Sequence, residues 1–394
     1  MAWTYPMLEG YRVVELALWV AGPAAGGLLA DWGADVIKVE GPDGDPMREA
    51  FKAIGVDRER VPPYELDNRG KRCVELDLTT EAGREDMDTL LGTADVFITN
   101  IRMPALEKLG LSIDAVRNRF PRLIYAAVTG YGLEGPDRDR AGYDIGAFWA
   151  RSSLAHSHAV GDNLPVGLRS AVGDHATAIA VVSGILAALL NREKTGEGRV
   201  VDVSLLRTGI YLNGWDIGTR QYFGRLSRNR PRTEQQTPML NSYRAGDGRA
   251  FWLLGVEQNR HWPPTLKSIG RLDLMEDERF RTSGLRSKNA SALIEILDAE
   301  FARRPMNEWT GIFDTNDVWW APINTIPDLL EDPQAIAAKA FVDMPAIEGE
   351  PPYQLVNGPV SFSDYAPAMK SVHTQGADTE EVLRDARESI RMRQ

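Results

Sequence analysis

Asp174 is the residue of this chain whose type and position best suit covalent chemistry. It follows Gly173, just before Ala176–Leu190, a run of mostly apolar or small residues that predicts a helix. An aspartate at a helix start can accept hydrogen bonds from the backbone N–H groups of the first turn and so cap the helix. An ionised carboxylate at a helix mouth can also act as a nucleophile. Position alone leaves both interpretations open.

Metal and hydrolase chemistry finds little support in the sequence. The chain has five histidines and one cysteine, Cys73. His156 and His158 share a polar loop without a second pair of ligands nearby, so we expect no metal site. The H-E-x-x-H, G-x-x-x-x-G-K-[ST] and G-x-S-x-G motifs are absent from the sequence. His175 directly follows Asp174, and adjacent helix residues do not face each other, so the two predict no dyad.

The segments around Asp174 alternate between strand and helix patterns. Strands are predicted at 11–17, 34–40, 73–76, 96–99 and 122–129, and a further strand ends the stretch 167–204. Helix patterns fall between them, one with Pro23 near its first turn and one at Thr80–Leu91. This alternation predicts an α/β fold with a parallel sheet covered on both faces. The first strand and helix lack G-x-G-x-x-G, which argues against a dinucleotide site.

A change in composition after the long helix indicates a second, smaller unit. Residues 220–240 are polar and Arg-rich, which is typical of a linker. We expect a small α+β domain at 241–326, with a hairpin around Gly246–Gly248 and a helix at 258–269 that Pro263 and Pro264 break. Residues 1–219 and about 327–394 then form the large domain, which ends in a helix from Thr379.

Composition limits the partners and the compartment. The 394 residues carry a net charge of −11, with 43% hydrophobic and 26% charged residues, so binding to nucleic acid or to an anionic membrane is not expected. The first ten residues have neither a basic nor an apolar region, which argues against a signal peptide. Ala176–Leu190 is too short to span a bilayer. We therefore expect a cytoplasmic protein without a membrane span.

Six segments, in one order, resemble the family III CoA-transferases. They are residues 8–48, 67–78, 94–111, 126–144, 173–178 and 192–205. The family includes formyl-CoA transferase, the carnitine CoA-transferases and the 2-methylacyl-CoA racemases. The resemblance covers most of residues 8–210, and the C-terminal part is similar more loosely.

The resemblance implies a fold, a cofactor and a mechanism. Such proteins bind coenzyme A on a Rossmann-like large domain, and the linker and small domain interlock two chains into a homodimer. An aspartate at the position of Asp174 attacks an acyl-CoA thioester and forms a mixed anhydride. The CoA thiolate returns to give an enzyme–CoA thioester, from which a free carboxylic acid takes the CoA. Covalent catalysis of this kind divides one difficult exchange into easier steps.

The same resemblance implies which residues surround the two substrates. The CoA contacts are expected from Asn100, Arg102, Lys108, Thr129, Gly130 and Tyr131. Arg69, Lys71 and Arg72 are candidates for the CoA phosphates, although a solvated basic turn explains them nearly as well. Gly41 stands where relatives often have an arginine against adenine. The substrate pocket is expected to include Trp19, Val20, Tyr143 and Glu257.

Racemisation is the main alternative to transfer. The racemases have a histidine at the position of Tyr143, and histidine suits general base work at neutral pH. Tyrosine has an unperturbed pKa of about 10, so this position favours transfer. Glu257 stands near the sequence position of a glutamate that the racemases also use. Trp19 and Val20 predict a less polar acyl pocket than a formyl or oxalyl enzyme needs. A thioesterase and a non-catalytic CoA-binding relative also remain open.

Overall fold

The computed structural model describes residues 6–50, 52, 55, 60–347, 350–366 and 369–393. The chain divides into two compact units. The first contains Met1–Ser157, Val166–Leu226 and Lys339–Gln394, and the second contains His158–Pro165 and Ser227–Ala338. The division therefore falls seven residues after the boundary expected at 219, and the return to the first unit comes at 339 instead of 327.

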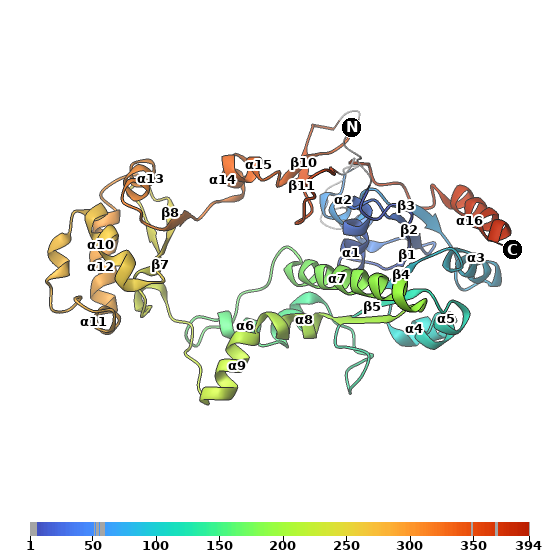
Figure 1. Ribbon diagram of the computed structural model, residues 1–394, viewed down its shortest axis with the longest axis horizontal. Coiled ribbons are helices and arrows are strands. Elements are labelled where there is room, and N and C mark those ends of the chain that lie inside the picture. Colours follow the sequence, from blue (N-terminus) through green and yellow to red (C-terminus); the bar gives the residue numbers. More distant parts are fainter. Residues whose placement is uncertain are drawn as a thin grey trace. The chain divides into compact units, whose positions relative to one another are not determined.

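A six-stranded parallel sheet forms the centre of the first unit (Figure 1). Its strands are β1 (Arg12–Leu16), β2 (Asp35–Glu40), β3 (Arg72–Glu75), β4 (Val96–Thr99), β5 (Ile124–Thr129) and β6 (Val200–Ser204). They lie in the order β3-β2-β1-β4-β5-β6. This is the strand order of the Rossmann fold. The predicted α/β class and all six predicted strands are confirmed.

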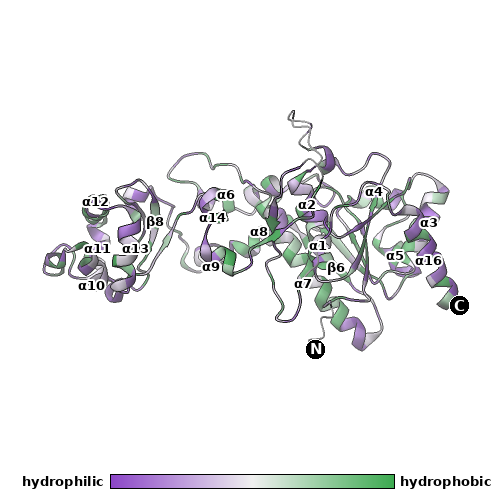
Figure 2. Ribbon diagram, turned by 90° about the horizontal axis from the view of Figure 1, so that it is seen from above, coloured by the Kyte–Doolittle hydropathy of each residue, from purple (hydrophilic) through white to green (hydrophobic). Residues whose placement is uncertain are grey.

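Helices cover both faces of this sheet, because successive strand side chains point to opposite faces. Val13, Val36 and Val96 pack with α1 (Ala21–Asp31) and α7 (Val172–Thr195). Val14, Ile37 and their neighbours pack on the other face. That face is covered by α3 (Glu81–Leu91), α4 (Met103–Lys108), α5 (Ile113–Arg119) and α16 (Thr379–Arg393). Figure 2 shows hydrophobic colour along α7 and hydrophilic colour along α16.

The 24-residue α7 is the longest helix in the described part of the chain. By length and composition alone it could cross a membrane. However, Ala178, Val181, Ile185 and Leu189 are buried in the core that α7 shares with α1 and the sheet. The apolar character that predicts this helix is therefore used in packing, and 44% of its most apolar window is buried.

Shorter elements connect and border the first unit. Those before α7 are η1 (Pro46–Glu49), α2 (Pro62–Asn68), the π-helix η3 (Asp144–Ala150) and α6 (Leu154–His158). After β6 come α8 (Leu205–Leu212) and α9 (Gly214–Phe223). The returning chain forms a hairpin of β10 (Phe341–Asp343) and β11 (Gln354–Val356). Because α9 continues to Phe223, the expected linker from 220 begins inside a helix.

The second unit is an α+β fold around an aromatic core. Its antiparallel sheet contains β7 (Leu240–Arg244), β8 (Ala250–Leu254) and β9 (Trp320–Pro322), which confirms the predicted hairpin. Its main helices are α10 (Gln258–Ile269), α12 (Ala290–Phe301) and α13 (Met306–Thr315), with α11 (Ser283–Lys288), α14 (Ile326–Leu330) and α15 (Pro333–Ala337) beside them. The core includes Phe251, Phe301 and Phe313.

The break expected at Pro263 and Pro264 is wrong, because α10 continues through both prolines. Each proline removes one backbone donor from the helix. Trp262 and Leu266, on either side of the prolines, are buried in the aromatic core, so tertiary packing holds the helix together.

Candidate active site

Asp174 lies in the first turn of α7, but it is not the cap of that helix. The cap residue is Ala171, whose backbone is left-handed at φ 48° and whose side chain cannot accept a hydrogen bond. The capping interpretation is therefore wrong, because α7 begins at Val172 and places Asp174 in its third position. Within the part of the chain that the structure describes, no hydrogen bond occupies its carboxylate. The side chain is thus available for chemistry.

Burial and the neighbouring charges raise the pKa of Asp174 into the neutral range. Burial, followed by the negative charges of Asp144 and Asp67, raises the pKa of Asp174 to about 7, while His175 acts in the opposite direction. A carboxyl group with a pKa near the working pH is ionised in an appreciable fraction of the molecules, and its ionised form is less stabilised than that of an ordinary carboxylate. Asp174 therefore combines a free carboxylate with a perturbed pKa.

Close packing of η3 against α7 brings Asp144 to this place. A Cβ atom on Gly173 would lie 2.6 Å from Cγ of Phe148 and 2.8 Å from Cβ of Asp144, so only glycine fits here. Phe148 is buried at the centre of a small cluster with Ala147 and Leu205. The missing side chain at Gly173 therefore lets the π-helix approach the first turn that carries Asp174.

The loop after β1 is held in a strained conformation at the carboxyl end of the sheet. Trp19 has a φ of 67°, which is uncommon for a bulky residue. Its backbone N–H donates to Oδ1 of Asp45 at 3.2 Å, and Asn100 accepts from Leu18 N at 3.0 Å and donates to Leu18 O at 2.6 Å. β1 and β4 are neighbours here, at the point where the strand order reverses and where such sheets bind ligands.

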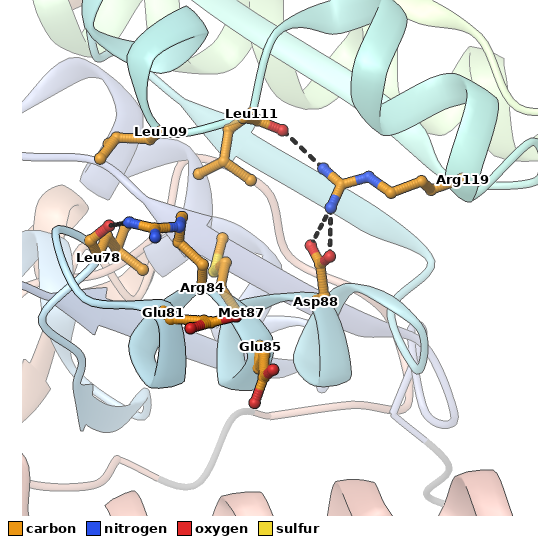
Figure 3. Close-up of a pocket in the computed structure, with 10 residues that line it drawn as sticks. Leu78, Glu81, Arg84, Glu85, Met87, Asp88, Leu109, Leu111 and Arg119 are labelled. Carbon is orange, nitrogen blue, oxygen red and sulfur yellow. Dashed lines mark hydrogen bonds and ion pairs between the residues drawn. The ribbon is translucent and has the colours of Figure 1, made fainter.

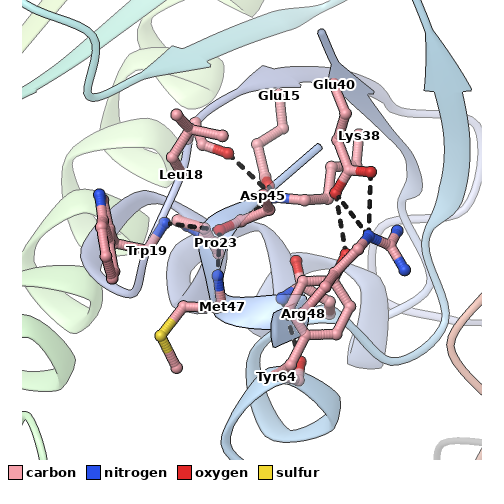
Figure 4. Close-up of polar contacts among 12 residues, drawn as sticks. Glu15, Leu18, Trp19, Pro23, Lys38, Glu40, Asp45, Met47, Arg48 and Tyr64 are labelled. Atoms are coloured by element: carbon pink, nitrogen blue, oxygen red, sulfur yellow. Dashed lines mark hydrogen bonds and ion pairs between the residues drawn. The ribbon is translucent and has the colours of Figure 1, made fainter. Parts of the chain in front are cut away.

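A buried ion network supports this loop (Figure 4). Lys38 has no exposed surface, and its Nζ atom donates to Asp45 and to Ala17 O at 2.9 Å and to Glu15 at 3.3 Å. Burial alone would lower the pKa of Lys38, but the charges of Glu15 and Asp45 outweigh it and raise the pKa. Lys38 thus stays charged and fixes the carboxylate that holds Trp19.

Trp19 and Tyr143, two predicted pocket residues, are brought together. Their rings meet edge-on with centroids 5.9 Å apart, and their exposed fractions are 42% and 62%. Tyr143 directly precedes Asp144, which packs on Gly173. The aromatic pair therefore lies on a continuous chain of contacts that leads to the first turn of α7. Val20, the third predicted pocket residue of this group, is instead partly buried against the core that contains α1.

The residues predicted to contact CoA differ in whether their side chains already bond to other residues. Arg102 and Lys108 are exposed at the two ends of α4 and have no ion pair among the described residues. The amide of Asn100 is occupied by Leu18. Oγ1 of Thr129 accepts from Gly132 N at 2.9 Å, and Arg151 lies over the ring of Tyr131 at 5.3 Å.

Gly130 completes this group. A Cβ atom there would lie 3.3 Å from Cα of Gly142, so the loop after β5 lies close against the segment that leads to η3. All these CoA assignments remain predictions.

Arg69 and Lys71 do not form a solvated basic turn, because both are buried and bonded to groups within the fold. Arg69 is buried and donates to both carboxylate oxygens of Asp31 and to Val356 O. Lys71 is fully buried and donates to Glu15 at 2.7 Å, to Pro23 O and to Asn68. We therefore do not retain these two residues as phosphate ligands.

Arg72 and Gly41 lie near the sheet edge in different surroundings. Arg72 is partly exposed and forms an ion pair with Asp35 at 2.7 Å, so its role toward CoA remains a prediction. A Cβ atom on Gly41 would meet nothing within 4 Å. Space at Gly41 is therefore open, although the chain provides no arginine there.

Glu257 belongs to the second unit. It immediately precedes α10, its side chain is 61% exposed, and its carboxylate pairs with Arg260 at 3.3 Å. Its part in the substrate pocket remains a prediction.

Several functional candidates could not be recognised from the sequence motifs. Asp144 and Asp67 act on the charge of Asp174, and His175 bonds to Asp67.

The sequence does contain one signal for the buried ion network around Lys38. Glu15 and Lys38 interrupt strands that are otherwise apolar, and a charged residue at a buried strand position needs a partner.

Two cavities of the first unit differ in their relation to the predicted site. One of about 350 Å³ reaches Asp67, His175 and Ile179 between α1, α2 and α7. The other, of about 330 Å³, lies beside α3 and contains Arg84 and Arg119, the latter paired with Asp88 (Figure 3). The second cavity includes none of the predicted site residues. Among the described residues, no group of three or more His, Cys, Asp or Glu side chains could hold a metal ion.

Comparison with known proteins gives one consistent family. The model of CoA-transferase family III matches residues 8–379. The (R)-2-hydroxy-4-methylpentanoate CoA-transferase of Clostridioides difficile is 34% identical, over 96% of this chain and 95% of the relative. The cinnamoyl-CoA:phenyllactate CoA-transferase of Clostridium sporogenes is 33% identical, over 96% and 93%.

The solved structures agree with the sequence relatives. A CAIB/BAIF family protein from Brucella suis superposes with a TM-score of 0.84 at 30% identity, covering 96% of this chain and 98% of the other. Similarity of this extent covers nearly the whole chain. The chain therefore belongs to CoA-transferase family III and is a CoA-transferase.

Proposed function

We propose that this protein is an acyl-CoA:carboxylate CoA-transferase in which Asp174 is the nucleophile. The observation that carries the proposal is the state of this carboxylate. It lies at the start of α7, is free of hydrogen bonds from the described residues, and has a pKa raised to about 7. A structural cap would show the opposite features, since hydrogen bonds and the helix dipole lower the pKa of a capping aspartate.

The proposed reaction has four exchanges and needs no oxidant, metal or net proton transfer. An oxygen of Asp174 attacks the thioester carbon, the C–S bond breaks, and a mixed anhydride and CoA thiolate form. The thiolate then attacks the Asp174 carbonyl carbon, releases the donor acid and leaves an enzyme–CoA thioester. The acceptor carboxylate attacks this thioester to give a second anhydride and thiolate. Attack of the thiolate on the acceptor carbonyl yields the new acyl-CoA and frees Asp174.

The helix start supports the charged steps of this reaction. Backbone N–H groups in the first turn of α7 and the positive end of its dipole favour negative charge nearby. Asp144 acts in the opposite direction by raising the pKa of Asp174. A carboxylate that is less stabilised in the free enzyme is a stronger nucleophile once ionised, so the pair favours attack.

We propose further that the acyl group is apolar and branched or aromatic. The partly exposed rings of Trp19 and Tyr143 support this, because they offer apolar area beside the contacts that lead to Asp174. The names of two relatives, which refer to 2-hydroxy-4-methylpentanoate and to cinnamoyl-CoA and phenyllactate, agree with such substrates. A tyrosine at position 143 instead of a histidine argues against the racemase alternative.

Binding of CoA is proposed for the carboxyl end of the sheet and α4. Arg102 and Lys108 are exposed cations without ion pairs among the described residues and suit the CoA phosphates. Thr129 is the last residue of β5, and Gly130 and Tyr131 follow it at the same end of the sheet. The location in the cytoplasm and the absence of a resident metal are also part of this proposal.

An interlocked homodimer is proposed from the family resemblance. Large apolar side chains stand exposed on α8 and α9 and support a protein contact there, namely Tyr211, Trp215, Tyr222 and Phe223. Light scattering on the purified protein measures the mass directly, and a monomer would contradict this part of the proposal.

The test is mass spectrometry of one reaction mixture. The protein would be incubated in deuterated water with branched and aromatic acyl-CoAs, a 2-methylacyl-CoA and free carboxylic acids. We expect CoA thioesters of the added acids, together with a protein adduct whose added mass is that of CoA less one water. Asp174→Asn should lose both products, whereas Asp114→Asn, an exposed first-turn aspartate of α5, should retain them.

Each other outcome contradicts the proposal in a different way. Deuterium at C2 of the thioester without CoA exchange would indicate a racemase. Hydrolysis alone would indicate a thioesterase. No reaction with any acyl-CoA would indicate a non-catalytic relative. Transfer retained by Asp174→Asn would remove Asp174 from the nucleophile role.

A further inference from the structure

His175 has an acceptor at each of its two ring nitrogens. Nδ1 lies 3.0 Å from the carbonyl oxygen of Ala171, and Nε2 lies 3.0 Å from Oδ1 of Asp67. A carbonyl oxygen can only accept, so Nδ1 must carry a proton. An ionised Asp67 also accepts, so Nε2 carries one as well. These partners therefore assign His175 as an imidazolium rather than a neutral ring.

Asp67 is a fixed partner for this cation. It is buried near the end of α2, and its backbone oxygen would lie 2.7 Å from a Cβ atom on Gly27 of α1. Burial raises the pKa of Asp67, and the hydrogen bond and charge of His175 and the charge of Lys71 reduce that rise without cancelling it. The bond to Asp67 raises the pKa of His175. Because imidazole is more basic than a carboxylate by over two units in water, the shared proton stays on the ring.

The other bond of His175 holds the turn before Asp174. Ser170 and Ala171 both have positive φ values, 60° and 48°, which non-glycine residues adopt at a cost. The oxygen of Ala171 accepts from the backbone N–H of His175 and also from its Nδ1–H. The side chain of His175 thus adds a second donor to the carbonyl oxygen of Ala171 and ties this left-handed residue to the first turn of α7.

His175 is also the cation closest in sequence to Asp174, amid several carboxylates. Asp144 from η3 and Asp67 from α2 disfavour the ionised form of Asp174, and His175 favours it. Behind Asp67, Lys71 pairs with Glu15 of β1. Asp31 and Arg69, which pair with each other, line the same cavity as His175. Loss of the charge on His175 would therefore leave Asp174 facing mainly negative charge.

We infer that the Asp67–His175 ion pair is a positioning device for the nucleophile, which holds the left-handed turn at 170–171 and keeps a positive charge beside Asp174. This inference rests on the proposed function, because it gives the pair a role only if Asp174 attacks a thioester. His175 is a positioning residue here, since it acts through Asp174 and no contact with substrate is assigned to it.

The pH profile of kcat/KM for CoA transfer tests the charge of His175. His175→Gln keeps a hydrogen-bonding side chain but removes the charge, so the rising limb should move to higher pH by about one unit. Transfer should fall about tenfold near pH 6 and recover to within about threefold above pH 9. His175→Lys restores a charge and should recover part of the loss at low pH.

A second histidine–aspartate pair provides the matched control. Nδ1 of His373 lies 2.7 Å from Asp378, near α16 on the opposite face of the sheet from α7. His373→Gln should leave the pH profile unchanged. If His175→Gln also leaves it unchanged while the wild type transfers CoA, the inference is overturned and the proposed function stands. If the wild type transfers no CoA, the proposed function itself fails.

Nuclear magnetic resonance of ¹⁵N-histidine-labelled protein tests the inference without activity. The chain has only five histidines, so the ring signals of His175 can be assigned by their loss in His175→Gln or, if that variant does not fold, in His175→Lys. We expect both ring nitrogens of His175 to be protonated at pH 7.5, and Asp67→Asn to shift that titration to lower pH. A neutral tautomer at pH 7.5 in the wild type would overturn the inference.

Discussion

Gly173 and Asp144 are packed so closely that no side chain fits between them. A Cβ atom on Gly173 would approach Cβ of Asp144 to 2.8 Å and the ring of Phe148 to 2.6 Å. The contact joins η3 to the first turn of α7, so it fixes the position of Asp174 relative to Asp144. The geometry of the candidate nucleophile thus depends on a residue that has no functional group.

Gly173→Ala should therefore reduce transfer more than it reduces stability. We expect a loss of about 1–3 kcal/mol in unfolding free energy from overpacking. Displacement of the helix start by about 1 Å should lower kcat by about 100-fold. Gly311→Ala in α13, where a Cβ atom meets nothing within 4 Å, is the control and should leave kcat unchanged. A fully active Gly173→Ala would show that the contact does not position Asp174.

Asp174→Asn should make the protein more stable at alkaline pH. The folded state holds the Asp174 proton up to a pH of about 7, whereas the unfolded chain loses it near 4. The wild type consequently loses stability as the pH rises from about 4 to about 7, and asparagine, which does not titrate, avoids that loss. The Tm difference should grow from near zero at pH 4 to a few degrees at pH 8, as measured by thermal unfolding. A difference that is constant with pH would contradict the raised pKa.

Lys38→Met should be strongly destabilising. It would leave the buried carboxylate of Asp45 without its cation and Glu15 with Lys71 alone, which costs about 3–5 kcal/mol. Arg228→Met removes one partner of an exposed ion pair with Asp162 and should cost less than about 1 kcal/mol. Urea unfolding of both variants measures the difference. Equal effects would mean that the network contributes no more than a surface pair.

The sequence predicted the sheet well because parallel strands are buried on both faces and are therefore nearly continuous apolar runs. The conformation at the start of α7 was harder to predict from the sequence, since nothing marks Ser170 and Ala171 as left-handed residues. The basic segment that contains Arg69 and Lys71 has the composition of a solvated turn. Its ion partners, Asp31 and Glu15, lie far away in the sequence, so only the fold shows that both cations are buried.

In the candidate site, too, local features could be predicted from the sequence and long-range contacts could not. Asp174 could be selected from its position and from the family resemblance, because both depend on local sequence. The surroundings of Asp174 could not be predicted, because Asp144 comes from a π-helix and Asp67, which also bonds to His175, comes from another helix. Charges that meet only in the folded chain leave no spacing pattern along it.

Arg102→Ala and Lys108→Ala should weaken binding of acyl-CoA without slowing the chemistry. Each removes an exposed cation of α4 that we assign to the CoA phosphates, so KM should rise about tenfold while kcat stays within about twofold. The KM of the wild type should rise with salt, and less so in the variants, because screening weakens the same contacts. Lys194→Ala, an exposed lysine in the last turn of α7, is the control. An unchanged KM in both variants would place the phosphates elsewhere.

Trp19→Ala should change which acyl group the enzyme prefers. The substitution removes the ring that meets Tyr143 but keeps the backbone bond to Asp45, so the loop remains in place. An apolar pocket that loses such a surface discriminates less, and kcat/KM for branched or aromatic acyl-CoAs should fall about tenfold relative to acetyl-CoA.

Two further variants separate this role of Trp19 from a general effect of losing an aromatic residue. Trp19→Phe should retain most of the preference, because phenylalanine can still pack against Tyr143. Trp252→Ala removes a tryptophan of nearly equal exposure, 41% against 42%, from the second unit, and we expect no change in preference. Competition between two acyl-CoAs in one mixture measures the ratio directly. If Trp19→Ala leaves that ratio unchanged, the aromatic pair does not form part of the acyl pocket, and the preference must arise from residues other than this loop.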